Sequence, residues 1–232
     1  IERKPKIIAS ILADNSYSEE VAGNIDRFMN EIKQGSISPV TDDHWDAPIW
    51  NSEIQKYDGK TWLEIPWFFA EALFYRRILD VTSYYSEDGN YLRDPFQQQK
   101  IKQITGDIRQ IEKEWHNYPD LDSKSVFSFL LHASLWGNRA DLSNITVKIS
   151  DQKDIAGRDE DHLILVDDTD AVFDIVSKGI KRLDFIADNA GRELIYDLIL
   201  ADYLLYAGFV GQVILHLKAS PFFVSDAMIK DA

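Results

Sequence analysis

Apolar residues recur at helical spacing through the first part of the chain. Two apolar stripes occupy the stretch up to about residue 34, and Ser18 followed by two glutamates is typical of a helix start between them. Pro66 stands where the first turn of a further helix tolerates proline. The remaining apolar periods predict helices over residues 61–80, 96–116 and 125–136. Residues 34–59, which contain glycine, prolines and several aspartates, are expected to form a loop.

The pattern changes near residue 144, where short apolar runs of strand length replace the long helical periods. Strands are predicted over residues 146–149, 162–166, 183–187 and 212–217, with helices over 171–178 and from 190 onward. Strands that alternate with helices imply a parallel sheet with helical crossovers. We therefore expect an α/β fold in which a helical N-terminal region, residues 1–143, precedes a Rossmann-like, mostly parallel α/β region, residues 144–232.

The composition narrows the classes of partner and chemistry. With 39 acidic against 25 basic residues the net charge is −14, which argues against nucleic acid and against an anionic membrane as partners. The chain contains no cysteine, so disulfides, zinc–thiolate sites and cysteine nucleophiles are excluded. This absence suits the reducing cytoplasm, where we expect the protein, and no apolar run is long enough to span a bilayer.

An acidic and an amide residue stand together at the end of one predicted strand. Asp188 and Asn189 follow the apolar run 183–187, and Ala190-Gly191 opens the next helix. Ligands bind at this position in open α/β sheets, and the N–H groups of a helix start favour an anion such as phosphate. An Asp beside an Asn also offers the oxygen donors that a hard divalent cation prefers. The alternative is that one of the two only caps the helix.

A second acid repeats this arrangement. Asp226 lies beyond the apolar run 212–217, after a turn at Ser220-Pro221. Two acids that follow neighbouring strands could converge on one metal ion.

Four stretches, taken in order, resemble the metal-dependent damage-control phosphatases, in the subgroup also described as protein-glutamate O-methyltransferase-like. They are TWLEIPWFFAEALFYRRIL (61–79), SLWGNRADLS (134–143), Asp188-Asn189-Ala190-Gly191 with Glu193, and HLKASPFFVSD (216–226). The resemblance covers nearly the whole chain. It implies a metal held by Asp188, Asn189 and Asp226, with Glu193 in contact with substrate. Members of that family continue to further phosphate-binding motifs, so we expect this chain to be part of a longer protein.

The resemblance implies metal-assisted hydrolysis of sugar phosphates or related small phosphorylated metabolites. The cofactor is then a divalent ion such as Mg²⁺, Mn²⁺, Co²⁺ or Ni²⁺, and Asp188 and Asp226 are the catalytic candidates, with the role of nucleophile or base left open. Asn138 and Arg139 are candidates for substrate binding, although Asn138 equally suits a helix end. Two other hypotheses remain: a carboxyl methyltransferase, which the lack of a GxGxxG motif weakens, and a non-catalytic fragment.

Two further acidic positions have ordinary structural explanations. Asp168-Thr169-Asp170 follows an apolar run, as an aspartyl nucleophile does, but Ala171-Val172 after it does not fit that motif, and these residue types cap helices well. Glu71 lies on a strongly aromatic helix and is either a buried acid paired with Arg or Tyr, or part of a helix that covers the active site.

Overall fold

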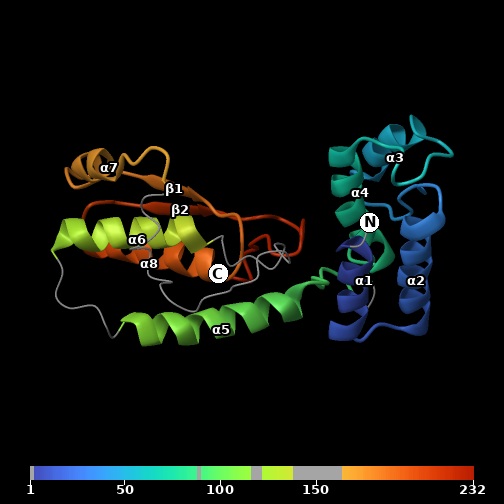
Figure 1. The fold of residues 1–232 in the computed structure, drawn as a ribbon, viewed down its shortest axis with the longest axis horizontal. Coiled ribbons are helices and arrows are strands. Elements are labelled where there is room, and N and C mark those ends of the chain that lie inside the picture. The colour runs from blue at the N-terminus through green and yellow to red at the C-terminus, as the bar shows by residue number, and fades with distance from the viewer. Residues whose placement is uncertain (1–2, 88–89, 116–121, 138–163) are drawn as a thin grey trace. The chain divides into compact units, whose positions relative to one another are not determined.

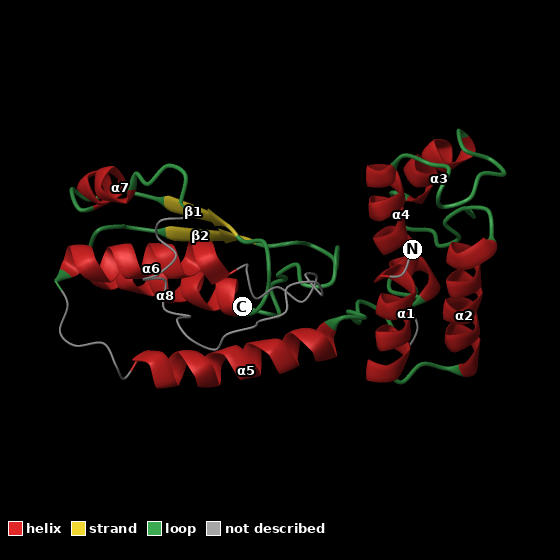
Figure 2. Cartoon of the chain, in the orientation of Figure 1, coloured by secondary structure: helices red, strands yellow, loops and turns green. Residues whose placement is uncertain are grey.

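The computed structural model describes residues 3–87, 90–115, 122–137 and 164–232. The chain forms two compact units, which are described separately. The first contains Ile1–Gln99 with Ser220–Phe223, and the second contains Lys100–Ala219 with Val224–Ala232. Figure 1 shows the order of the elements along the chain, and Figure 2 shows that helices predominate in its described part, with short strands.

Four helices form the first unit. They are α1 (Arg3–Asp14), α2 (Glu19–Gln34), α3 (Ala47–Gln55) and α4 (Trp67–Val81). The two predicted apolar stripes face the core, since Ile8, Ile11 and Ile25 are almost completely buried. Ser18 is the N-cap of α2, as predicted, and its hydroxyl accepts a hydrogen bond from the N–H of Val21. The first 34 residues therefore fold as their periodicity indicates.

Helix α3 lies inside the stretch that was expected to be a loop. It is only nine residues long and begins with Pro48 in its first turn, where the fixed φ of proline suits a helix. Two of its residues, Ala47 and Ile54, are buried. A helix this short gives too few apolar repeats for a period to be recognised, so the prediction of a loop over residues 34–59 was wrong there.

Helix α4 buries two arginine side chains, whose charges are neutralised by acidic side chains of α4 itself and of other segments. The guanidinium of Arg76 donates hydrogen bonds to Asp42 at 2.7 Å and to Asp46 at 2.8 Å. Arg77 pairs with Glu31 and, one turn along the helix, with Asp80. Both arginines are buried, and a buried charge is tolerated only when it is paired. The packing of the first unit thus depends on matching these charges as well as on its apolar core.

Where the structure describes it, the second unit combines four helices with two strands. Its elements are α5 (Gln97–Trp115, from Lys100 onward), α6 (Ser123–Gly137), α7 (Thr169–Val176), β1 (Leu183–Ile186), α8 (Arg192–Tyr206) and β2 (Val213–His216). The strands pair in parallel, and α8 is the crossover between them. Figure 1 shows α6 and α8 running side by side along the strands. The expected α/β class, with a helical first region and a parallel sheet, is confirmed.

The core of the second unit lies between the helices and one face of the strands. Leu130 and Leu204 are its most buried members, and Leu183 and Phe185 of β1 pack against this cluster. A smaller cluster of Ala187, Ala190, Leu194 and Ala227 lies beneath the ends of the strands. The apolar runs predicted as strands at 183–187 and 212–217 therefore fold as expected, because each has a helix-covered face.

Two other predictions for this region have different outcomes. The run 162–166 was expected to be a strand, but Ile164–Val166 form no strand, and the side chains of Leu165 and Val166 are exposed. A strand needs a neighbour to satisfy its backbone, and this run does not pair with β1 or β2. The expected strand at 146–149 and the boundary near residue 143 lie outside the described residues. The domain boundary near residue 143 therefore stays a prediction.

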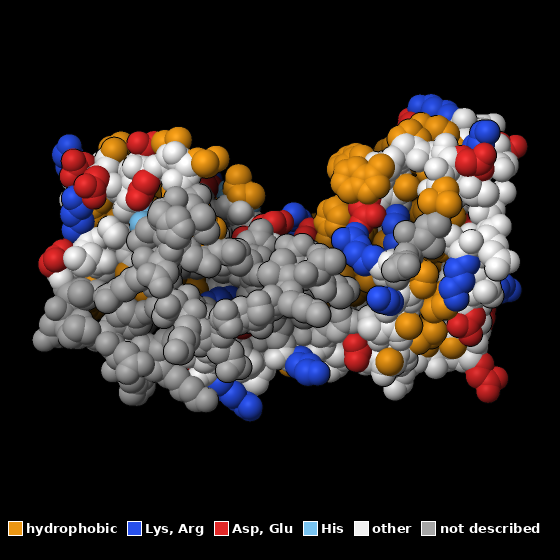
Figure 3. Space-filling model, viewed as in Figure 1, with side chains coloured by type: hydrophobic (Ala, Val, Ile, Leu, Met, Phe, Trp, Pro, Cys, Tyr) orange, Lys and Arg blue, Asp and Glu red, His pale blue; other side chains and the backbone are white. Residues whose placement is uncertain are grey.

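The surface of the first unit exposes several large apolar side chains (Figure 3). Leu63, Trp67 and Phe68 are each more than two-thirds exposed. Among the described helices none is both long and apolar enough to cross a bilayer.

Replacing Arg76 by Met tests the buried charge network. The substitution leaves Asp42 and Asp46 without their shared cation, so we expect the free energy of unfolding to fall by about 3–5 kcal/mol. The matched control is Lys56→Met, because Lys56 pairs with Glu53 at an exposed position and its removal is expected to cost less than about 1 kcal/mol. Urea denaturation followed by tryptophan fluorescence measures both. Equal losses in the two variants would contradict the role assigned to Arg76.

Replacing Gly137 by Ala tests the contact between α6 and α8. A Cβ atom at Gly137 would lie 2.5 Å from the Cα of Glu193, so the backbones must move apart. We expect a loss of about 1–3 kcal/mol in the free energy of unfolding. Gly106→Ala in α5 is the control, because nothing lies within 4 Å of the added Cβ, and alanine there should stabilise the helix by roughly 0.5–1 kcal/mol. Thermal denaturation followed by circular dichroism should give shifts of opposite sign.

Candidate functional site

The parallel strands bring two chain segments to one edge of the sheet. The register runs from Leu183 opposite Val213 to Ile186 opposite His216, and the N–H of Ala187 bonds to the carbonyl of His216 at 3.0 Å. Both strands therefore end at the same level. Asp188 and Asn189 follow β1 at this edge, and Lys218 follows β2.

A third segment returns to the same edge. Asn189 and Asp226 form an isolated antiparallel bridge. The N–H of Ala190 donates to the carbonyl of Ser225 at 2.6 Å, and the N–H of Ala227 donates to the carbonyl of Asp188 at 2.7 Å. Backbone hydrogen bonds thus fix Asp226 beside the residues that follow β1, as the sequence predicted for the two acids.

The carboxylates of Asp188 and Asp226 share one cation. The ammonium of Lys218 lies 3.2 Å from Oδ2 of Asp226 and 3.7 Å from Oδ1 of Asp188. The two acids differ in exposure, because the side chain of Asp226 is only 4% exposed and that of Asp188 is 56% exposed. The edge therefore offers one buried carboxylate and one that faces solvent, around a position that already holds a positive charge.

Asn189 links this pair to Glu193. Its side-chain amide donates to Oε2 of Glu193 at 3.1 Å and to Oδ2 of Asp188 at 3.3 Å, while its oxygen accepts a hydrogen bond from the hydroxyl of Ser225 at 2.7 Å. Asn189 is buried. The four residues Asp188, Asn189, Glu193 and Asp226 are thus brought together.

Burial shifts the pKa values of two acidic side chains in this site. It raises the pKa of Asp226 to about 6, although the nearby charge of Lys218 acts in the opposite direction. Burial also raises the pKa of Glu193, the hydrogen bond from Asn189 lowers it, and the charge of Asp188 raises it. Carboxylates that are both desolvated and close together favour a positive partner.

These residues fit a hard divalent cation. The Oδ2 atom of Asp226 is buried and accepts no hydrogen bond from the described residues, apart from its ion pair with Lys218. The described part of the chain contains no group of three or more His, Cys, Asp or Glu side chains placed to hold a metal ion, so the candidate donors at this edge are two carboxylates and an amide oxygen. That is a set which Mg²⁺ accepts, because this ion is usually held by one or two carboxylates, with water and substrate phosphate completing its shell.

Helix α8 begins beside the site. Gly191 precedes it with φ of 103°, a conformation that favours glycine. A Cβ at this position would lie 2.7 Å from Nε2 of Gln103 and 3.2 Å from Oδ2 of Asp107, both on α5. Gly191 therefore lets α5 approach the segment that carries Asp188 and Asn189.

The remaining predicted residues have separate outcomes. Asn138 and Arg139 lie outside the described residues. Asp168 is the N-cap of α7, but its side chain makes no capping hydrogen bond; instead Oδ1 of Asp167 accepts a hydrogen bond from the N–H of Thr169 at 3.0 Å. Asp170, in the first turn of α7, pairs with Lys124 at the surface.

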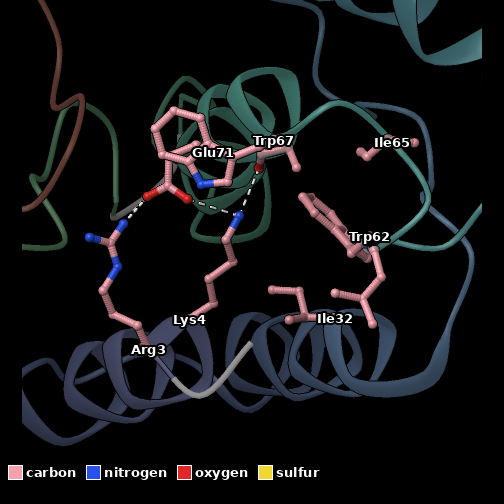
Figure 4. A pocket seen from close by; sticks show the side chains of 9 residues that line it. Arg3, Lys4, Ile32, Trp62, Ile65, Trp67 and Glu71 are labelled. Carbon is pink, nitrogen blue, oxygen red and sulfur yellow. Dashed lines mark hydrogen bonds and ion pairs between the residues drawn. The ribbon is translucent and has the colours of Figure 1, made fainter.

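Glu71 belongs to a separate cavity in the first unit. The cavity has a volume of about 330 Å³, and Figure 4 shows the carboxylate of Glu71 between Arg3 and Lys4, with Trp62 and Trp67 nearby. Both basic residues pair with Glu71, and the ammonium of Lys4 also donates to the carbonyl of Ala70. These polar groups satisfy one another, so Glu71 is the buried, paired acid that was one of the two predicted alternatives.

Lys218, Ser225 and Lys100 contribute to the site without having been predicted. Of these three residues, Lys218 could have been found from the sequence, because it follows the second predicted strand as Asp188 follows the first. Lys100 is 126 residues from Asp226 in sequence, yet its ammonium donates to the carbonyl of that residue at 2.6 Å.

The chain has relatives of known family along its whole length. Residues 2–232 match the damage-control phosphatase ARMT1-like domain. The chain is 31% identical to damage-control phosphatase ARMT1 of Danio rerio, over 99% of this chain and 61% of that protein. It is 32% identical to the protein of that name from Rattus norvegicus and 31% identical to the one from Homo sapiens, in both cases over 89% of this chain and 53% of the relative. The chain thus spans between half and two-thirds of the length of these curated relatives.

A solved structure shares the fold. It is the crystal structure of a DUF89 family protein from Pyrococcus horikoshii, with a TM-score of 0.52 and 20% sequence identity, over all of this chain and 67% of that one. The chain belongs to the damage-control phosphatase ARMT1-like family.

Proposed function

We propose that this chain carries the metal site of a metal-dependent phosphatase that acts on sugar phosphates or related small phosphorylated metabolites. The observation that supports this most strongly is the pair of carboxylates, Asp188 and Asp226, on either side of one ammonium at the sheet edge. Family membership supports the phosphatase class. The wider activity is part of the proposal, because the named relatives are longer than this chain.

Each residue of the site has a role in this proposal. Asp188, Asn189 and Asp226 hold the cation, which when bound supplies a Lewis acid that polarises phosphoryl oxygens and offsets their charge. Asp226 is buried and fixed by the backbone, so it serves as the rigid ligand. Asp188 faces solvent and is the carboxylate that a substrate can meet, as nucleophile or base.

The remaining neighbours suit a phosphorylated metabolite. Lys218 places a positive charge beside the carboxylates, and its side chain is 40% exposed, so it can pair with a phosphoryl oxygen. Glu193 lies in the first turn of α8, held by Asn189, where its carboxylate can accept hydrogen bonds from substrate hydroxyls. The net charge of −14 disfavours an anionic substrate on the surface as a whole, so the bound cation together with Lys218 would supply the local positive charge that a phosphate group needs.

The two other hypotheses are not favoured by any contact described above. A carboxyl methyltransferase needs a methyl-donor site and no divalent ion. A non-catalytic fragment would bind metal without turnover. Both are separated from the phosphatase by the experiments that follow.

Metal binding by this chain is the direct test. We expect one Mn²⁺ ion to bind, and Asp226→Asn to weaken binding at least tenfold, because the variant loses the charge of the buried carboxylate. Isothermal titration calorimetry after treatment with EDTA measures this. The matched control is Asp184→Asn, which removes an exposed carboxylate that pairs with Arg182 and His216. Unchanged Mn²⁺ affinity in Asp226→Asn would place the metal elsewhere.

Phosphate release tests the activity. A panel of sugar phosphates with Mg²⁺, Mn²⁺, Co²⁺ or Ni²⁺ is expected to give metal-dependent release that EDTA abolishes. Asp188→Asn should reduce the rate at least 100-fold, the size that corresponds to about 2.7 kcal/mol of transition-state stabilisation, whereas Asp184→Asn should keep it. Release that survives EDTA, or that persists in Asp188→Asn, would argue against the proposed site. Methyl transfer without a divalent ion would favour the methyltransferase instead.

A further inference from the structure

Lys100 is a fully buried lysine directly behind the candidate metal site. Its side chain is 1% exposed, and its ammonium donates to the backbone carbonyl of Asp226 at 2.6 Å and to Oδ2 of Asp231 at 2.9 Å. The side chain of Asp231 is equally buried. Lysine is seldom buried to this extent, because an ammonium loses its hydration and must be fully compensated. Such a group needs a reason beyond packing.

The ammonium closes a turn of the chain. Asp231 also accepts a hydrogen bond on Oδ2 from the N–H of Met228 at 2.9 Å, and its own N–H donates to the carbonyl of Met228 at 2.9 Å. Lys100 therefore contacts both ends of the segment 226–231, at Asp226 through the backbone and at Asp231 through the carboxylate. The segment 226–231 is thus tied at both ends to the buried ammonium of Lys100.

The peptide group that follows Asp226 is held at both of its ends. Its carbonyl accepts from Lys100, and its N–H, which belongs to Ala227, donates to the carbonyl of Asp188 at 2.7 Å. The orientation of this peptide plane sets the backbone angle ψ of Asp226. With its backbone fixed on this side, the side chain of Asp226 is directed toward Lys218 and Asp188, where Oδ2 lies 3.2 Å from the ammonium of Lys218.

We propose that Lys100 is a positioning residue for the metal site, whose ammonium locks the peptide of Asp226 and so aims the carboxylate of Asp226 at the cation. The inference deepens the proposed function and rests on it. A buried ion pair contributes little net stability, so the Lys100–Asp231 pair is better explained by the geometry that it imposes. Residues behind a metal ligand typically change metal affinity by about 10- to 100-fold when they are replaced.

An electrostatic role and a positioning role of Lys100 predict opposite effects of Lys100→Met on the affinity for Mn²⁺. Removing a positive charge close to a cation site strengthens cation binding if electrostatics alone decides, and the uncovered carboxylate of Asp231 adds to that effect. Loss of the hydrogen bond to Asp226 weakens binding if positioning decides. We expect the Mn²⁺ dissociation constant of Lys100→Met to rise at least tenfold in calorimetric titration. An unchanged or lower constant would overturn the proposal.

Two further variants keep the test independent of folding. The double variant of Lys100→Met with Asp231→Asn removes both charges of the pair, so no unpaired charge is left buried, while the carbonyl of Asp226 still lacks its donor. It is expected to bind Mn²⁺ at least tenfold more weakly. Ile111→Ala is the control for simple destabilisation, because Ile111 is a buried residue of the same helix that packs in the other core cluster. Its Mn²⁺ affinity should stay within about twofold of the parent at a temperature where circular dichroism shows all variants folded.

Amide hydrogen exchange tests the positioning role of Lys100 in the absence of a metal ion. In EDTA-treated protein, the segment 224–231, including the amide of Ala227, should exchange at least tenfold faster in the double variant than in Ile111→Ala. Equal exchange would overturn the role of Lys100 even if the metal site exists. Conversely, a parent chain that binds no Mn²⁺ but shows this difference in exchange would remove the metal site from the proposed function while supporting the backbone lock by Lys100.

Discussion

The parallel pairing of β1 with β2 is the constraint on which the candidate site depends. It brings Asp188 and Asn189 to the same edge as Lys218, and the bridge between Asn189 and Asp226 completes the arrangement. The segments that carry Asp188, Lys218 and Asp226 are joined at this edge by backbone hydrogen bonds. Ligands bind at this position in α/β folds, at the carboxyl ends of the strands.

The chain uses buried charge in two ways. In the first unit Arg76 and Arg77 are enclosed by carboxylates, and these charges hold helix α4 against its neighbours. In the second unit the carboxylate of Asp231 pairs with the ammonium of Lys100, which is buried with it, whereas the carboxylate of Asp226 pairs with Lys218, whose side chain is 40% exposed. A desolvated carboxylate favours a positive partner. The partner of Asp226 is therefore a group that solvent can reach.

The two acids of the site differ in how firmly they are held and in how far solvent reaches them. Asp226 is buried, and its backbone is bonded through both neighbouring peptide groups, whereas Asp188 is largely exposed. A fixed ligand keeps a metal position defined, and an accessible one allows a substrate to approach it. The chain belongs to the damage-control phosphatase ARMT1-like family, and the contacts give a physical account of how this edge of the sheet is kept in shape.

The sequence by itself determined the local elements and the candidate ligands. Helices with several apolar repeats and a cap, as after Ser18, and the unit of strand, Asp188-Asn189 and helix are recognisable because near neighbours in the chain set them. Helix α3 was too short to show a period, and the run 162–166 lacked a strand partner, which no local pattern reveals. The tertiary structure alone decided that Lys100 meets a carbonyl 126 residues away, because packing between distant segments selects the group that a buried charge contacts.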